Sequence, residues 1–144
     1  MELVVDNGAP EELPSSCAGT WGASSPEADG YYYAGGPPGA PHGLAIEGCA
    51  SAMAKSVGVQ FAATNGDGPG TYSMGTIQYT DGNGSTWGVS GDSFTLIVTQ
   101  GPSFGTPGGA FDGTFTANVS HGGNAAHMLS GSFHVCHVHD LLAP

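Results

Sequence analysis

The stretch GTFTANVSHGGNAAHMLSGSFHVCH, residues 113–137, decides the fold. Apolar and polar residues alternate along both of its arms, and this period of two is typical of half-buried β-strands. The inward positions of the two arms are Phe115, Ala117, Val119, Phe133 and Val135. Between the arms, HGGN (121–124) has the composition of a turn. The stretch therefore predicts two antiparallel strands that face one core.

The same pattern continues toward the N-terminus. SVGVQFAAT (56–64) and SFTLIVTQ (93–100) alternate in the same way, and DGNG (81–84) predicts a hairpin turn. In TYSMGTIQYT (71–80) the apolar positions shift register in the middle, which predicts a β-bulge at Gly75. Many short strands separated by Gly, Pro, Asn and Asp predict a sandwich or barrel.

The first third of the chain is rich in loops. GGPPGAPHG (35–43) is incompatible with a regular strand, because proline cannot donate to a ladder. CASAMAK (49–55) is the best candidate for a helix, of one or two turns. We predict a single domain over residues 1–144: an all-β antiparallel β-sandwich, jelly-roll-like, with at most one short helix.

The cysteines suggest one disulfide. Cys17, Cys49 and Cys136 match no zinc motif, and the odd count allows one bridge and one further thiol. We expect Cys17 to pair with Cys49, since both flank the loop-rich first third, and Cys49–Cys136 is the rival pairing.

Charge excludes two classes of partner. The formal net charge is −11, and Lys55 is the single Lys or Arg in the chain. Nothing can therefore neutralise phosphates, which excludes nucleic acid and anionic membrane surfaces as partners. No stretch is apolar for long enough to cross a membrane, and MELVVDNGAP (1–10) lacks the apolar region of a signal peptide. Acidity with almost no Lys or Arg fits a secreted or extracytoplasmic protein. We expect secretion with the signal already removed.

The C-terminal histidines are candidate metal ligands. On a strand, His137 and His139 share one face, and His134 shares the other with Cys136. Two imidazoles two residues apart can meet one divalent metal ion, although the alternative is a terminal strand with ordinary polar side chains. No G-x-S-x-G elbow or carboxylate pair indicates catalysis, so we predict no enzyme activity, no catalytic residues and no other cofactor.

The aromatic residues suggest a ligand surface. Trp21, Tyr31, Tyr32, Tyr33 and Trp87 lie beside Gly-rich stretches and outside the alternating core runs. Three consecutive tyrosines on a strand cannot all face inward. Exposed rings beside Asp and Asn would suit the faces of sugars, whereas the alternative is that the rings fill the ends of the core.

Two groups of motifs carry a family resemblance. LVVDNG (3–8), GTWG (19–22), DGYYYAGG (29–36) and HGLAIEG (42–48) resemble the opening of extracellular jelly-roll modules of the carbohydrate-binding type. GTFTANV (113–119) and LSGSFHV (129–135) resemble the closing hairpin of small secreted or lipoprotein β-sandwiches of bacteria. The first resemblance implies non-catalytic sugar binding through Trp21 and the three tyrosines.

The leading expectation is thus a binding module for carbohydrate or another surface polymer. One alternative is a structural subunit that forms homo-oligomers by strand addition. Its edge strands lack lysine, and ELVVD (2–6) could complete a neighbour's sheet. The other alternative is a metal-binding protein that uses the C-terminal histidines.

Overall fold

The computed structural model describes residues 1–13, 28–33, 42–49, 57–88, 93–106, 108–121, 126–137 and 140. These residues form eleven strands and no helix. The strands are β1 (Glu2–Val5), β2 (Glu11–Glu12), β3 (Ala28–Tyr33), β4 (Gly43–Cys49), β5 (Gly58–Ala63), β6 (Gly70–Tyr72), β7 (Gly75–Thr80), β8 (Thr86–Trp87), β9 (Ser93–Gln100), β10 (Ala110–Val119) and β11 (His127–His137). Of the helix expected at 49–55, all residues after residue 49 lie outside the described residues, so the helix stays a prediction.

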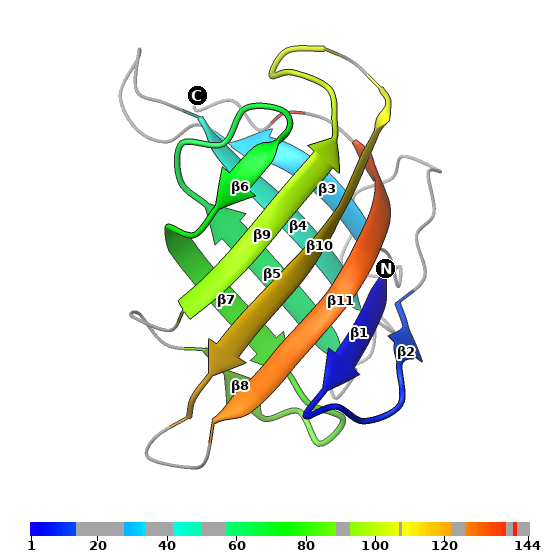
Figure 1. Cartoon of the computed structure of the whole chain (residues 1–144), viewed down its shortest axis with the longest axis vertical. Helices are drawn as coiled ribbons and strands as arrows, with labels where there is room; N and C mark the ends of the chain where they lie inside the picture. The colour runs from blue at the N-terminus through cyan, green and yellow to red at the C-terminus, as the bar shows by residue number, and fades with distance from the viewer. Residues whose placement is uncertain are drawn as a thin grey trace.

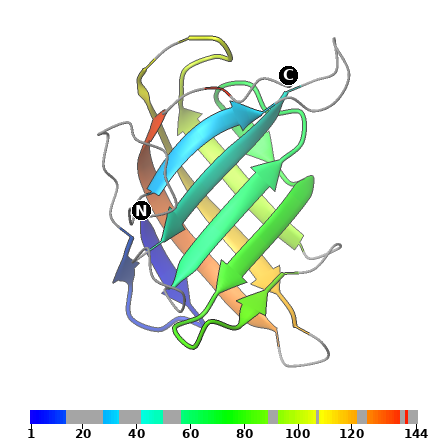
Figure 2. The ribbon, with the colours of Figure 1, turned by 180° about the vertical axis from the view of Figure 1, so that it is seen from behind.

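The strands make two layers that cross each other. β9, β10, β11 and β1 form the layer nearer the viewer in Figure 1, and β3, β4, β5, β7 and β8 form the layer seen from behind in Figure 2. Both layers belong to one sheet, with the order β6-β9-β10-β11-β3-β4-β5-β7-β8. The prediction of an all-β sandwich is confirmed, and its two layers are a single folded sheet that does not close.

Strand β11 joins the two layers. Along its first half it pairs antiparallel with β1, where Leu3 lies opposite Gly131. At its end it pairs parallel with β3, through Cys136–Asp29 and His137–Gly30. This is the one parallel pair among the strands described, and it makes the sheet mixed rather than wholly antiparallel as predicted.

The core lies between the layers, where the sequence placed it. The five predicted inward residues of β10 and β11 are each at most 4% exposed. The Phe61 ring of the rear layer lies 4.8 Å from the Phe115 ring and 5.7 Å from the Phe94 ring of the front layer, between centroids. Tilted ring contacts of this kind add to the free energy of apolar burial.

Two glycines on β10 and β11 make room for two of these rings. Gly113 lies opposite Phe133, and Phe115 lies opposite Gly131. A Cβ atom on Gly113 would lie 2.4 Å from Phe133 Cζ, and one on Gly131 would lie 2.6 Å from Phe115 Cζ. Each ring therefore lies over the glycine across the ladder, and these two positions exclude any larger residue.

The predicted bulge at Gly75 is wrong. Tyr72 ends β6, which pairs with β9, whereas Gly75 begins β7, which pairs with β5. The chain changes layers between them, and this change accounts for the shift in the apolar pattern. Gly75 has a φ of 139°, and a Cβ there would lie 2.0 Å from the Ala62 carbonyl oxygen.

We expect Gly131→Ala to lower the free energy of unfolding by about 2 kcal/mol or more, because the new methyl group meets the Phe115 ring and the Glu2 carbonyl oxygen. The control is Gly82→Ala, where the added Cβ makes one ordinary contact of 3.8 Å with Val57. Urea denaturation of both variants measures the difference. Equal stability of the two variants would show that the Phe–Gly pair is not a constraint.

Candidate functional site

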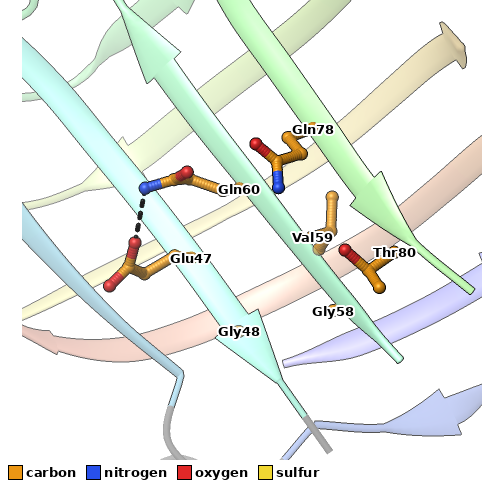
Figure 3. Close-up of a pocket in the computed structure, with 7 residues that line it drawn as sticks. All are labelled: Glu47, Gly48, Gly58, Val59, Gln60, Gln78 and Thr80. Carbon is orange, nitrogen blue, oxygen red and sulfur yellow. Dashed lines mark hydrogen bonds between the residues drawn. The ribbon is translucent and has the colours of Figure 1, made fainter. Parts of the chain in front are cut away.

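A row of polar side chains crosses the outer face of the rear layer. Glu47 on β4 lies opposite Gln60 on β5, and Gln60 lies opposite Gln78 on β7. Residues directly opposite in antiparallel strands share a face, with Cβ atoms about 5 Å apart. Gln60 Nε2 donates a hydrogen bond of 2.7 Å to Glu47 Oε2 (Figure 3). We call Glu47, Gln60 and Gln78 the polar row.

A shallow pocket of about 260 Å³ adjoins the polar row. Its described lining is Glu47, Gly48, Gly58, Val59, Gln60, Gln78 and Thr80 (Figure 3). Gly58 occupies the outward position next to Gln60 on β5 and lies opposite Thr80. Because Gly58 has no side chain, the surface is hollowed there, and the side chains of the row stand at its margin.

An aromatic ring lies further along the same face. Tyr33 on β3 pairs with Gly43 on β4, and a Cβ on Gly43 would lie 2.0 Å from Tyr33 Cζ. The ring therefore lies over Gly43, and Tyr33 Oη donates a hydrogen bond of 3.0 Å to the Ala63 carbonyl oxygen. Gly43 and Glu47 are four residues apart on β4, which corresponds to about 13 Å along a strand. Between them Ala45 of β4 lies opposite Ala62 of β5, and Ala45 is buried while Ala62 is half-buried.

The other two tyrosines do not offer rings to a ligand. Tyr32 points into the core and is 0% exposed, and Tyr31 is 7% exposed. The prediction that the tyrosine rings are accessible is therefore wrong for these two. Tyr32 points inward because the middle of three consecutive strand residues faces opposite to its neighbours.

The Tyr32 hydroxyl ties two loops to β3. It donates a hydrogen bond of 2.6 Å to the Pro102 carbonyl oxygen and accepts one of 2.6 Å from the Gly68 N–H. Burial raises the pKa of Tyr32 to about 12. Both loops lie at one end of the sandwich, so this hydroxyl has a structural role.

Trp87 is half-buried and packs against the core. Its ring centroid lies 4.2 Å from that of His127 and 5.6 Å from that of His121. Trp87 Nε1 donates a long hydrogen bond of 3.5 Å to Asp81 Oδ2. The residue thus covers one end of the core, as in the alternative interpretation from the sequence. Trp21 lies outside the described residues.

The DGNG segment is a hairpin turn between β7 and β8, as predicted. Asp81 Oδ1 accepts hydrogen bonds from the backbone N–H groups of Asn83 and Ser85, at 2.8 and 2.9 Å. The bond from Ser85 is the largest cause of the lowered pKa of the Asp81 carboxyl. The Asp81 carboxylate therefore stabilises the hairpin turn.

Three histidines each contact a separate aspartate. His127 lies 2.6 Å from Asp6, His134 lies 2.6 Å from Asp112, and His137 lies 2.7 Å from Asp140. His134 is exposed and His137 is buried, so the two imidazoles lie on opposite faces of β11. The part of the chain that the structure describes contains no group of three His, Cys, Asp or Glu side chains suited to a metal ion.

Both ring nitrogens of His137 are engaged. Nδ1 lies 3.1 Å from the Gly108 carbonyl oxygen, and Nε2 contacts Asp140 Oδ1. Neither nitrogen offers a lone pair to a metal ion in this arrangement. His139 lies outside the described residues, so its pairing with His137 stays a prediction.

Cys136 is disulfide-bonded, which in a chain of three cysteines is incompatible with the expected Cys17–Cys49 bridge. Cys17 and the side chain of Cys49 lie outside the described residues, so the rival pairing Cys49–Cys136 stays a prediction. Cys136 lies near the end of β11 and is buried.

No family model, curated protein or solved structure matches this chain. Within the described residues, no helix has the length and apolarity needed to cross a membrane.

The sequence reasoning missed the polar row. Its signal was present, because Gln60 alternates with Val59 and Phe61, and Gln78 alternates with Ile77 and Tyr79. Alternation identifies these residues as outward-facing. It does not show that they lie opposite one another, since that depends on which strands pair.

Replacing Tyr32 by Phe should lower the free energy of unfolding by about 1–3 kcal/mol, because the buried Gly68 N–H and the half-buried Pro102 carbonyl oxygen lose their hydrogen-bond partner. Tyr79→Phe is the matched control. Tyr79 is also buried, and its hydroxyl has no hydrogen bond to another described residue. Thermal and urea unfolding of both variants test this, and equal losses would contradict the role assigned to the Tyr32 hydroxyl.

Asp6 makes stability depend on pH in the acid range. The hydrogen bond from His127, and then that from the Met128 N–H, lower the pKa of the Asp6 carboxyl below 3.8. The unfolded chain therefore binds this proton at a higher pH than the folded chain does. The stabilisation is present above about pH 4 and is lost as the pH falls through the lowered pKa.

We expect Asp6→Asn to be less stable than the natural chain near pH 7, with a difference that vanishes near pH 2. Asn tolerates the φ of 51° found at residue 6, so the backbone conformation is kept. Urea midpoints at the two pH values measure the effect, with Glu11→Gln on the exposed strand β2 as control. A midpoint difference of the same size at both pH values would contradict the role of the carboxylate.

Proposed function

We propose that this protein is a non-catalytic binding module for an uncharged carbohydrate, which it holds on the outer face of β4, β5 and β7. The observation that carries the proposal is the polar row beside the pocket, with Glu47, Gln60 and Gln78 in direct register. Carboxylates accept hydrogen bonds, and carboxamides both donate and accept them. A row of such groups suits sugar hydroxyls, which also donate and accept.

The charge of the protein favours a ligand without negative charge. Glu47 belongs to the row, and the chain has a formal net charge of −11. A uronate or sulfated polymer would be repelled by this field, whereas a neutral polysaccharide would not. Anionic glycans should therefore bind weakly or not at all.

The polar row and its pocket form the open part of this face. The half-buried Tyr33 ring lies about 13 Å from the row along β4. Ala45, between them, is 1% exposed, so the surface is not open along that stretch. A sugar held at the row would therefore meet the Tyr33 ring as a separate contact. Of the three predicted tyrosines, Tyr33 alone keeps a role in this proposal.

The pocket is better suited to binding than to catalysis. Glycoside hydrolysis uses a pair of carboxyl groups on either side of the scissile bond. Glu47 is the single carboxylate among the described lining residues, and it is hydrogen-bonded to Gln60. We also propose an extracytoplasmic location, which fits a module that meets polysaccharides.

Self-assembly by strand addition has less support. ELVV, the segment expected to complete a neighbour's sheet, pairs with β11 of its own chain as β1. The described sheet ends at β2, β6 and β8, which have only two or three residues each. Short edge strands offer little template for a further strand.

Binding should depend on both glutamines of the row. We expect Gln60→Ala and Gln78→Ala each to weaken binding of a neutral oligosaccharide about fivefold, because each removes one hydrogen-bonding group. Gln100→Ala is the matched control, since Gln100 is an exposed glutamine on β9 of the other layer. Titration calorimetry with cello-, xylo- and manno-oligosaccharides, and with alginate as the anionic polymer, measures the affinities.

Failure of all the neutral glycans to bind would overturn the proposal. So would binding that survives both row variants. Gel filtration of the same samples tests strand addition, because an assembling subunit would elute as oligomers whose size does not depend on Gln60 or Gln78.

A further inference from the structure

We infer that His137 and Asp140 form a proton-dependent latch that holds the described part of the loop between β9 and β10, residues 101–106 and 108–109, against the end of β11. This goes beyond the proposed carbohydrate site, because the latch lies at the end of the sandwich where Tyr32 ties its two loops. It rests on hydrogen bonds to residues that the proposed binding face does not use.

The two side chains of the latch are buried, whereas the loop backbone that they hold is exposed. His137 is the last residue of β11, and its side chain is 1% exposed, while that of Asp140 is 11% exposed. His137 Nδ1 lies 3.1 Å from the Gly108 carbonyl oxygen, and Nε2 lies 2.7 Å from Asp140 Oδ1. Asp140 Oδ2 accepts a hydrogen bond of 2.7 Å from the Gly105 N–H. The two side chains therefore hold the loop at two points.

These contacts determine which atoms carry protons. A carbonyl oxygen can only accept, so Nδ1 of His137 must carry a proton. An ionised carboxylate can also only accept, so Nε2 opposite Asp140 must carry one as well. The closed arrangement with an ionised Asp140 therefore requires His137 as the doubly protonated imidazolium.

Loss of one proton breaks this arrangement. A neutral imidazole that keeps its proton on Nδ1 directs the Nε2 lone pair at the Asp140 carboxylate, and two acceptors at 2.7 Å repel each other. If the proton stays on Nε2 instead, the Gly108 carbonyl oxygen loses its donor. Either outcome leaves a ring nitrogen of the buried His137 side chain facing an acceptor, which is costly because little solvent reaches that ring.

The surroundings supply no competing charge within the described residues. From β3, the Tyr32 ring lies 5.9 Å from the His137 ring, and its hydroxyl is engaged by Pro102 and Gly68. From β10, the Phe111 ring lies at 5.4 Å.

Two other titratable groups reach the loop at Phe104. Asp67 Oδ1 accepts a hydrogen bond of 3.0 Å from the Phe104 N–H. The His42 ring stacks on the Phe104 ring, with centroids 3.5 Å apart. Neither Asp67 nor His42 is hydrogen-bonded to the His137 ring. Asp140 is therefore the charged group in contact with the His137 imidazolium.

The closed arrangement needs a proton on each ring nitrogen of His137, so loss of either proton favours opening. The loop surrounds a hollow of about 290 Å³, lined by Gln100, Gly101, Pro102, Thr106, Gly108, Gly109 and Ala110. Opening the latch changes the shape of this hollow while the core stays intact.

Amide hydrogen exchange measured by NMR tests the latch directly. The reporter is the Gly105 N–H, and the data are protection factors, which remove the intrinsic pH dependence of exchange. Between about pH 5 and about pH 9, where histidine titrates, we expect protection of Gly105 to fall about tenfold or more. Core amides of β10 should stay protected. Protection of Gly105 that does not change with pH would overturn the inference.

The Asp140→Asn variant distinguishes a proton-dependent latch from a contact that is only structural. The Asn amide can donate to the Nε2 lone pair of a neutral His137, while its oxygen still accepts the Gly105 N–H. The loop should then be closed when His137 is neutral and lose this contact when Nε2 is protonated, so the pH dependence of Gly105 protection is reversed relative to the natural chain. Asp112→Asn is the matched control, since it alters the partner of the exposed His134 on the same strand and should keep the natural profile.

A measurement on the natural chain guards against a variant that folds poorly. Nitrogen-15 chemical shifts of His137 report the protonation of each ring nitrogen. We expect both nitrogens to be protonated at any pH where Gly105 is protected. A neutral His137 in the protected state, or an Asp140→Asn variant that titrates like the natural chain, would show that the latch does not exist.

Discussion

The packing of two phenylalanine rings over two glycines is the constraint on which the rest of this structure depends. Phe133 covers Gly113 and Phe115 covers Gly131, so each ring lies over a position that has no side chain. A slip of one residue between β10 and β11 would place both rings on the wrong face, because side chains alternate with a period of two. The two pairs therefore fix the register of the longest ladder in the described sheet, and β11 then presents one edge to both β1 and β3.

The proposed binding face follows from this register. Phe115 and Phe94 of the front layer meet Phe61 of the rear layer, and this contact turns the odd-numbered residues of β5 toward the core. Gln60 must then point outward, opposite Glu47 and Gln78. The same alternation that builds the core thus places the polar row on the surface, and Gly58 leaves the hollow beside it. A ring over a glycine recurs on this face at Tyr33 and Gly43, where it provides an aromatic surface.

One end of the sandwich is held by buried polar groups. Tyr32 joins the loops at Gly68 and Pro102, and His137 with Asp140 holds the neighbouring part of the second loop. Hydrogen bonds shielded from water are strong when every partner is present and costly when one is lost. The packing of the apolar side chains in the core does not depend on pH. The proton-dependent latch that we propose therefore lies in the loops, away from the sheet face that carries the proposed ligand site.

The sequence by itself determined the all-β class, most of the strand positions, the inward residues of β10 and β11 and the hairpin turn at Asp81, because alternation and turn composition are local properties. Only the tertiary structure decided which strands pair. It placed β6 and β7 in different layers, made β11 and β3 parallel, and brought Asp6 to His127 across 121 residues. It also turned Tyr32 into the core and set Glu47, Gln60 and Gln78 side by side. The physical reason is that a period of two shows only that a side chain faces one side of its strand, whereas its neighbours across the ladder depend on how distant rings and glycines fit together.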